Sequence, residues 1–183
     1  MNADFIRNMY SLDGKIALVT GGSRGIGFGI AEYLAKAGAE VAITARSEQT
    51  LKQASDRFTG MGIPVHVFPA DLSVPDNADR LFDLVVSETG GADILVNNAG
   101  TTYRAPADAF PDEEWDRVMN VNLTSLFRLS AAFARHCAEK KKPGKIINIA
   151  SLLSEAARPT IPAYAASKGA VRQLTKALSV EWA

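Results

Sequence analysis

Short apolar segments alternate with amphipathic segments along most of the chain, and this alternation constrains the fold more than any other feature. The apolar segments are rich in β-branched residues and have the length of strands; they span residues 15–20, 40–45, 65–68, 93–96 and 145–150. The segments between and after them have helical spacing and span residues 25–36, 48–58, 75–88, 112–142 and 163–183. Buried strands that alternate with helices indicate a parallel sheet covered on both faces. We therefore predict one α/β domain over residues 1–183, with a doubly wound parallel sheet.

The composition excludes several classes of partner. The 183 residues include 20 Lys and Arg and 20 Asp and Glu, so the formal net charge is zero and no basic excess would attract nucleic acid or an anionic membrane. The single cysteine, Cys137, excludes an internal disulfide and is typical of a reducing cytoplasm. Residues 1–13 lack the apolar run of a signal peptide, and no segment reaches the ~18 apolar residues of a membrane span. We expect a cytoplasmic protein that acts on a small molecule and has no metal site.

The first predicted strand runs into a glycine-rich turn, residues 20–27 (TGGSRGIG). Glycines there allow the backbone to approach a pyrophosphate, and the helix N-terminus offers free N–H groups to phosphates. A glycine cluster can also be only a turn, but its place after the first strand of an α/β chain favours a dinucleotide site and a Rossmann-type sheet. The residues predicted to bind the cofactor here are Gly21, Ser23, Arg24, Gly25, Ile26 and Gly27.

The end of the second predicted strand indicates which dinucleotide is bound. Dinucleotide folds often place a carboxylate there for the ribose hydroxyls, but residues 44–47 read Thr-Ala-Arg-Ser. Arg46 lies 19 residues after Gly27, where a cation could meet a 2′-phosphate, and Arg24 could add a second charge. Both arginines could instead simply face solvent. We favour NADP(H) over NAD(H).

Ser151, Tyr164 and Lys168 form the candidate catalytic group. Tyr164 and Lys168 are four residues apart and share one face of the predicted last helix, while Ser151 closes the fifth predicted strand. A free phenol has a pKa of about 10, and one cation about 4 Å away at an effective dielectric of ~20 stabilises the phenolate by ~4 kcal/mol, roughly three pKa units. Taken alone, a Tyr–Lys pair on a helix is more simply a surface pair without function.

Several motifs occur together, however, and with them the chain resembles the classical short-chain dehydrogenase/reductase family. The glycine turn at 20–27, the NNAG segment at 97–100 and the YAASK segment at 164–168 match that family's motifs in order. A serine stands 13 residues before Tyr164, and Asn122 lies in a matching Val-Asn-Leu segment. The resemblance extends from about Leu12 onwards.

The resemblance implies a role for each residue of the catalytic group. Tyr164 would be the general acid or base, and Ser151 would orient the substrate oxygen. Lys168 would lower the pKa of the tyrosine and hold the nicotinamide ribose, so that Tyr164 and Lys168 also contact the cofactor. Asn122 would help to hold a proton-relaying water; its alternative is an ordinary helix asparagine that bonds to backbone.

Further cofactor contacts and an assembly follow from the same resemblance. Asp71 and Leu72 would lie at the adenine, although Asp71 could merely stabilise a turn. Independently of the resemblance, the local sequence predicts that Ser73 caps the helix after it. The other expected cofactor contacts are Asn98, Ala99 and Gly100. The helices around 122–138 and 164–182 would build a homotetramer or homodimer, unless they are covered within the monomer.

The substrate is less constrained than the chemistry. Residues 101–104, 113–122 and 145–154 resemble the branch of gluconate 5-dehydrogenases and 2-deoxy-D-gluconate 3-dehydrogenases. A 3-oxoacyl-acyl-carrier-protein reductase is the alternative, and a non-catalytic NADP-binding regulator is an alternative of another class. Arg104 and Arg158 could bind a sugar-acid carboxylate, or could be solvated loop residues.

The end of the sequence departs from the family pattern. Family members continue with further strands and a substrate lid, whereas this sequence ends at Ala183, directly after the catalytic helix. We therefore expect the C-terminal strands and lid to be missing and one edge of the sheet to be open.

Overall fold

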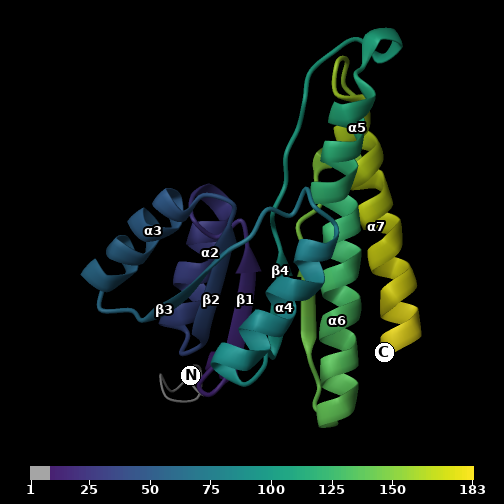
Figure 1. Cartoon of the computed structure of the whole chain (residues 1–183). Helices are drawn as coiled ribbons and strands as arrows, with labels where there is room; N and C mark the ends of the chain where they lie inside the picture. Colours follow the sequence, from purple (N-terminus) through teal and green to yellow (C-terminus); the bar gives the residue numbers. More distant parts are fainter. Residues whose placement is uncertain (1–8) are drawn as a thin grey trace.

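The sheet is parallel throughout and has the predicted strands. The computed structural model describes residues 9–183, so most of the segment predicted to lack a signal peptide lies outside the described residues. The strands are β1 (Ile16–Thr20), β2 (Glu40–Ala45), β3 (Val65–Pro69), β4 (Ile94–Asn97) and β5 (Lys145–Asn148), in the order β3-β2-β1-β4-β5 (Figure 1). The strand order reverses between β1 and β4, which places a ligand crevice beyond the carboxyl ends of these two strands.

Helices cover both faces of the sheet, which confirms the doubly wound α/β fold. The helices with bounds inside the described residues are α2 (Gly25–Lys36), α3 (Glu48–Gly60), α4 (Asp76–Thr89), α5 (Asp112–Met119), α6 (Ser125–Lys140) and α7 (Pro162–Trp182). Figure 1 shows α2 and α3 on one face and α4 and α6 on the other. Successive residues of β1 point to opposite faces, so that Ala17 and Val19 pack with α2 and α3, while Leu18 packs with α4 and α6.

The predicted helix over 112–142 is in fact three elements. Between α5 and α6, residues Asn120–Thr124 form a π-helix, η2, which holds Asn122. Such π segments are rare and are frequently found at functional sites. The start of α7, α5 and the loop that leads from β4 to α5 together project beyond the sheet (Figure 1).

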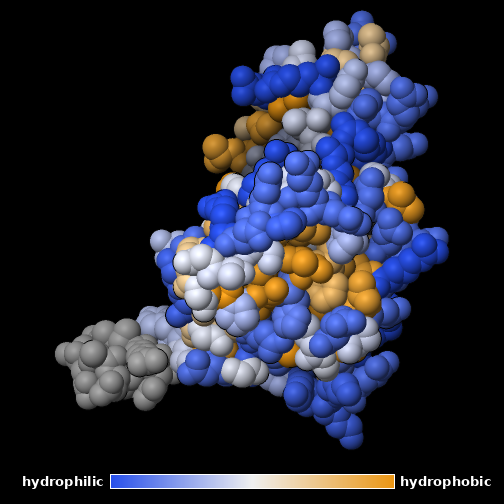
Figure 2. Space-filling model, turned by 60° about the vertical axis from the view of Figure 1, so that its left-hand side comes forward, coloured by the Kyte–Doolittle hydropathy of each residue, from blue (hydrophilic) through white to orange (hydrophobic). Residues whose placement is uncertain are grey.

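The sheet has an open edge at β5, as expected. Within residues 9–183, β5 pairs only with β4, and its Ile147 is 46% exposed. The face seen in Figure 2 is largely hydrophilic, with hydrophobic residues gathered near its middle. Over the described part of the chain, the helices are too short or too polar to cross a membrane.

Candidate active site

A buried threonine joins the two segments that meet at the crevice. Thr20 ends β1, and its Oγ1 accepts hydrogen bonds from the backbone N–H groups of Asn98 (3.0 Å) and Ala99 (2.9 Å). In return, Nδ2 of Asn98 donates to the carbonyl oxygens of Thr20 (2.8 Å) and Gly21 (3.3 Å). The glycine turn and the NNAG segment are therefore one rigid unit. The sequence reasoning missed Thr20, although its position immediately before the turn could have indicated it.

The glycine turn has the geometry of a phosphate site. Gly21 and Gly25 have left-handed φ angles of +65° and +57°. A Cβ at Gly27 would lie 2.3 Å from the carbonyl oxygen of Gly21 and 2.4 Å from Nδ2 of Asn98, so only glycine fits there. Arg24 and Gly25 are exposed, Ile26 is 70% exposed, and half-buried Ser23 precedes them. No side chain caps the N-terminus of α2, so its N–H groups are available to an anion.

Arg46 and Asp71 lie on the same side of the crevice, after β2 and β3. Arg46 is exposed directly after β2. Asp71 is also exposed, and its Oδ1 accepts hydrogen bonds from the backbone N–H (2.9 Å) and Oγ (2.7 Å) of Ser73. These two bonds, with a smaller contribution from the charge of Arg46, hold the pKa of Asp71 below its usual value. Leu72, next to it, is buried.

This arrangement corrects one prediction and supports one alternative. Ser73 does not cap the following helix: α4 begins later than predicted, after Pro75 and without a side-chain cap, and the Ser73 hydroxyl donates to Asp71 instead. Asp71 does stabilise its own turn, as the structural alternative held. Its contact with adenine stays a prediction.

Lys168 is buried beside Tyr164 in α7. The residue is only 4% exposed, and its Nζ lies 5.9 Å from the centroid of the Tyr164 ring. Nζ also donates a hydrogen bond of 2.5 Å to the carbonyl oxygen of Ile149, just beyond β5. Burial lowers the pKa of Lys168. The carbonyl contact offsets part of this desolvation and ties α7 to the carboxyl end of the sheet.

The strand before Ser151 ends earlier than predicted. It ends at Asn148, so Ser151 follows β5 instead of closing it. Its Oγ accepts a hydrogen bond from the backbone N–H of Leu153 (3.2 Å) and caps the short 3-10 helix η3 (Leu152–Ser154). This helix packs against α7, so Ser151 is half-buried at the start of the segment that leads to Tyr164.

Asn122 connects the loop after β4 to the helix that carries Tyr164. It is 1% exposed, and its Oδ1 accepts from the backbone N–H of Thr101 (2.8 Å). Its Nδ2 donates to the carbonyl oxygen of Thr101 (3.0 Å) and to Oγ of Ser167 (3.0 Å). Asn122 thus forms the bonds to backbone that an ordinary helix asparagine would form. It also has a side-chain contact with α7 that was not predicted from the sequence.

The two candidate substrate arginines lie on neighbouring segments. Arg104 and Arg158 are both exposed, and neither forms an ion pair within residues 9–183. The backbone N–H of Ala105 donates to the carbonyl oxygen of Thr160 (3.0 Å), which joins the two segments. Thr160 has a φ of +69°, an unusual angle for a β-branched residue. Both guanidinium groups are therefore available to bind an anion. No observed contact directs either of them into the crevice.

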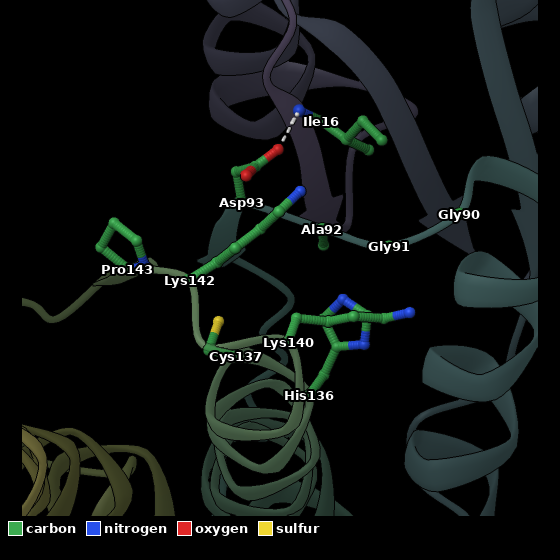
Figure 3. A pocket seen from close by; sticks show the side chains of 10 residues that line it. All are labelled: Ile16, Gly90, Gly91, Ala92, Asp93, His136, Cys137, Lys140, Lys142 and Pro143. Atoms are coloured by element: carbon green, nitrogen blue, oxygen red, sulfur yellow. Dashed lines mark hydrogen bonds between the residues drawn. The ribbon is translucent and has the colours of Figure 1, made fainter.

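A small cavity of about 120 Å³ lies at the opposite edge of the sheet, before the amino ends of β1 and β4 (Figure 3). Asp93, His136 and Lys142 are among its lining residues, and Oδ2 of Asp93 accepts from the backbone N–H of Ile16 (3.0 Å). Burial, with a smaller contribution from Asp93, raises the pKa of the Cys137 thiol, which keeps it protonated. This cavity is separate from the candidate site.

Comparison with known proteins identifies the family. The sequence profile described as "short chain dehydrogenase" matches residues 15–183. The 2-dehydro-3-deoxy-D-gluconate 5-dehydrogenase of Bacillus subtilis is 45% identical over 189 aligned residues, which cover 98% of this chain and 69% of the relative. The 3-oxoacyl-[acyl-carrier-protein] reductase of Vibrio cholerae is 42% identical over 173 residues, covering 93% and 68%.

A solved structure agrees with these matches. It is a gluconate 5-dehydrogenase from Burkholderia cenocepacia in complex with NADP and tartrate, with a TM-score of 0.88 and 43% identity, covering 97% of this chain and 69% of that one. The sequence match and the fold therefore point to the same conclusion: the chain belongs to the short-chain dehydrogenase family, as its motifs predicted, and is an oxidoreductase that acts on CH–OH groups.

Proposed function

We propose that residues 1–183 form an NADP(H)-binding catalytic domain that interconverts the alcohol and the ketone of a sugar acid of the gluconate type. The observation that carries the proposal is the burial of Lys168 beside the ring of Tyr164, at the edge of the sheet where the glycine turn also lies. A buried ammonium next to a phenol is the arrangement needed to make tyrosine a proton donor and acceptor near neutral pH.

The glycine turn and its surroundings fit a dinucleotide. A Cβ at Gly25 would meet no atom within 4 Å, so the space beside the turn is open there. Gly27, in contrast, is packed tightly against the backbone of Gly21. Arg46 follows β2 where a carboxylate would select NAD(H), and Arg24 stands exposed in the turn. These cations favour a 2′-phosphate, and the related Burkholderia enzyme was solved with NADP. When bound, the nicotinamide supplies or accepts the hydride.

The protein's own residues transfer the proton and position the substrate. During reduction, the hydroxyl of Tyr164 donates its proton to the developing alkoxide, while the Ser151 hydroxyl keeps that oxygen in place. The charge of Lys168 stabilises the phenolate that remains. Both protons of Asn122 Nδ2 are already donated to Thr101 and Ser167, so an oxygen of Asn122 must hold any relay water.

The sugar-acid assignment rests on similar proteins and on two exposed arginines. Arg104 and Arg158 stand on joined segments near the crevice, and either guanidinium can pair with a carboxylate. The identity of the Vibrio reductase (42%) lies between those of sugar-acid enzymes such as the Gluconobacter oxydans gluconate 5-dehydrogenase (40%) and the Bacillus enzyme (45%), so a 3-oxoacyl thioester is the second candidate substrate.

One assay separates these functions. NADPH oxidation is followed with 5-keto-gluconate, a 3-oxoacyl thioester and a neutral ketone of similar size. We expect the highest kcat/KM with 5-keto-gluconate. Preference for the thioester would overturn the substrate assignment. Tight NADPH binding without turnover of any ketone would instead support the alternative of a non-catalytic NADP-binding regulator.

We further propose that the protein is cytoplasmic and a homodimer or homotetramer assembled through α6 and α7. Both helices carry small residues at partly exposed positions, among them Ala131, Ala134, Ala166 and Ala170. Small side chains allow helices of two subunits to approach closely. Light scattering of the intact protein at micromolar concentration should give a multiple of the chain mass, and a monomeric mass would contradict the assembly.

A further inference from the structure

We infer that Ser167 is a positioning residue that holds the catalytic turn of α7 against Asn122. Ser167 lies between Tyr164 and Lys168 in the sequence, and its side chain is fully buried. No role in the proposed chemistry requires a hydroxyl at this position. The inference rests on the proposed function, because it concerns how Tyr164 is held for that reaction.

The Ser167 hydroxyl is both an acceptor and a donor. Its Oγ accepts from Nδ2 of Asn122 (3.0 Å) and donates to the carbonyl oxygen of Tyr164 (2.8 Å). The hydroxyl therefore connects the π-helix η2 directly to the backbone of the residue that we assign as the proton donor. A shift of α7 relative to η2 would have to break this buried pair of bonds, and breaking them would leave a buried amide proton unpaired.

From Asn122 the hydrogen-bond network continues, through Thr101, to the charged side chain of Arg117. Asn122 bonds to both backbone groups of Thr101, and Oγ1 of Thr101 accepts from NH1 of Arg117 (2.9 Å). Arg117 is itself held by Glu114 at 2.6 Å. An unbroken series of hydrogen bonds thus runs from α5 through the loop after β4 to the catalytic turn. Because a misplacement of about 1 Å can cost a large factor in rate, loss of this link should reduce turnover.

The chain provides a matched control in Ser130. Ser130 is also fully buried in a helix, and its Oγ accepts from Nδ2 of Asn97 at 3.0 Å. Asn97 keeps a second partner, Oδ1 of Asn148, just as Asn122 keeps Thr101. Replacing either serine by alanine removes the same chemical contact, but only Ser167 is attached to the catalytic turn.

The test compares Ser167→Ala with Ser130→Ala in the intact protein. We expect both variants to lose similar stability, whereas only Ser167→Ala lowers kcat, by about tenfold, with the KM for NADPH changed less than twofold. Ser167→Cys, whose thiol is a weaker donor and acceptor, should fall between wild type and Ser167→Ala. In an Asn122→Ala background, Ser167→Ala should lower kcat no further, because its effect acts through Asn122. Equal kcat in the two serine variants, or additive losses with Asn122→Ala, would overturn the inference.

A readout without turnover keeps this test separate from the proposed function. Amide hydrogen exchange over residues 164–171 should accelerate more in Ser167→Ala than in the equally destabilised Ser130→Ala. Absence of ketone reduction in the wild type would refute the proposed function alone. Unchanged exchange at 164–171 in Ser167→Ala would refute the positioning role, whatever the substrate.

Discussion

At the carboxyl end of β1, buried atoms of Thr20 and Asn98 fix the glycine turn, whereas beyond the end of β5 residues 155–160 are all exposed. On the first side, a single added methyl group at Gly27 would collide with backbone. On the second, Arg158 has no ion-pair partner in the described chain, and one hydrogen bond joins its segment to the loop that holds Arg104.

The difference shows how the two parts of the site are specified. In the proposed site, the cofactor side is defined by close packing of backbone against backbone, which leaves few sequences that fit. The proposed substrate side consists of side chains that extend from loops, which can change without disturbing the sheet. This explains why relatives of similar identity act on gluconate derivatives and on 3-oxoacyl groups.

The largest effect is expected from Gly27→Ala. The new Cβ would lie 2.3 Å from the carbonyl oxygen of Gly21, so the turn must shift. We expect the loss of measurable NADPH binding in a fluorescence titration and a fall in unfolding free energy of about 1–3 kcal/mol. Gly29→Ala is the control, since a Cβ there meets no atom within 4 Å. Equal NADPH affinity in the two variants would show that the turn is not specified by packing.

Arg46→Asp should have the next largest effect, on the choice of cofactor. A charged hydrogen bond to the 2′-phosphate contributes about 1.5–3 kcal/mol, so the preference for NADPH over NADH should fall by roughly ten- to more than a hundredfold. Lys52→Asp, the same charge change on the exposed surface of α3, is the control. A preference of the wild-type enzyme for NADH would show that Arg46 does not select for the 2′-phosphate of NADPH.

Arg104→Ala tests the substrate side. If Arg104 binds the carboxylate, its loss should raise the KM for 5-keto-gluconate by about tenfold, roughly 1.4 kcal/mol, and leave a neutral ketone unaffected. Arg158→Ala, made in parallel, distinguishes the two candidate anchors. Equal changes for charged and neutral ketones would remove Arg104 from the substrate site.

The smallest effect concerns Asp71 and the pH dependence of stability. Its folded pKa lies below the usual 3.8 because Ser73 donates two hydrogen bonds to the carboxylate. The ionised group therefore stabilises the fold above that value, and this stabilisation is lost as the pH falls through the folded pKa. Unfolding free energies measured from pH 5 to pH 2 should decline less steeply in Asp71→Asn than in wild type. Parallel curves would mean that the Ser73 contacts do not favour the charged form.

The sequence predicted the sheet well, because buried β-branched strands and the glycine turns between strands and helices are local patterns. All five strands agree with their predicted bounds to within two residues. The π-helix at Asn120–Thr124 could not be predicted, since it accompanies contacts of Asn122 with residues 21 and 45 positions away in the sequence. Ser73 was misassigned because α4 begins only after Pro75, and the Ser73 hydroxyl forms a local bond to the Asp71 carboxylate instead.

Thr20 and Ser167 were also missed. Their side-chain contacts with Asn98 and Asn122 form only when segments far apart in the sequence meet. Ser167 did carry a signal, however, because a small polar residue in a buried position between Tyr164 and Lys168 needs a hydrogen-bond partner.

In the proposed reaction Tyr164 supplies the proton, and Tyr164→Phe tests this role most directly. The substitution removes one hydroxyl and keeps the ring beside Lys168. NADPH affinity is measured by fluorescence titration, and kcat with the ketone that wild type reduces fastest. We predict a fall in kcat of about 10²- to 10⁴-fold with NADPH affinity changed less than twofold. A variant that binds NADPH normally and keeps more than about a tenth of wild-type kcat, a loss smaller than general acid catalysis predicts, would contradict the assignment of Tyr164 as proton donor.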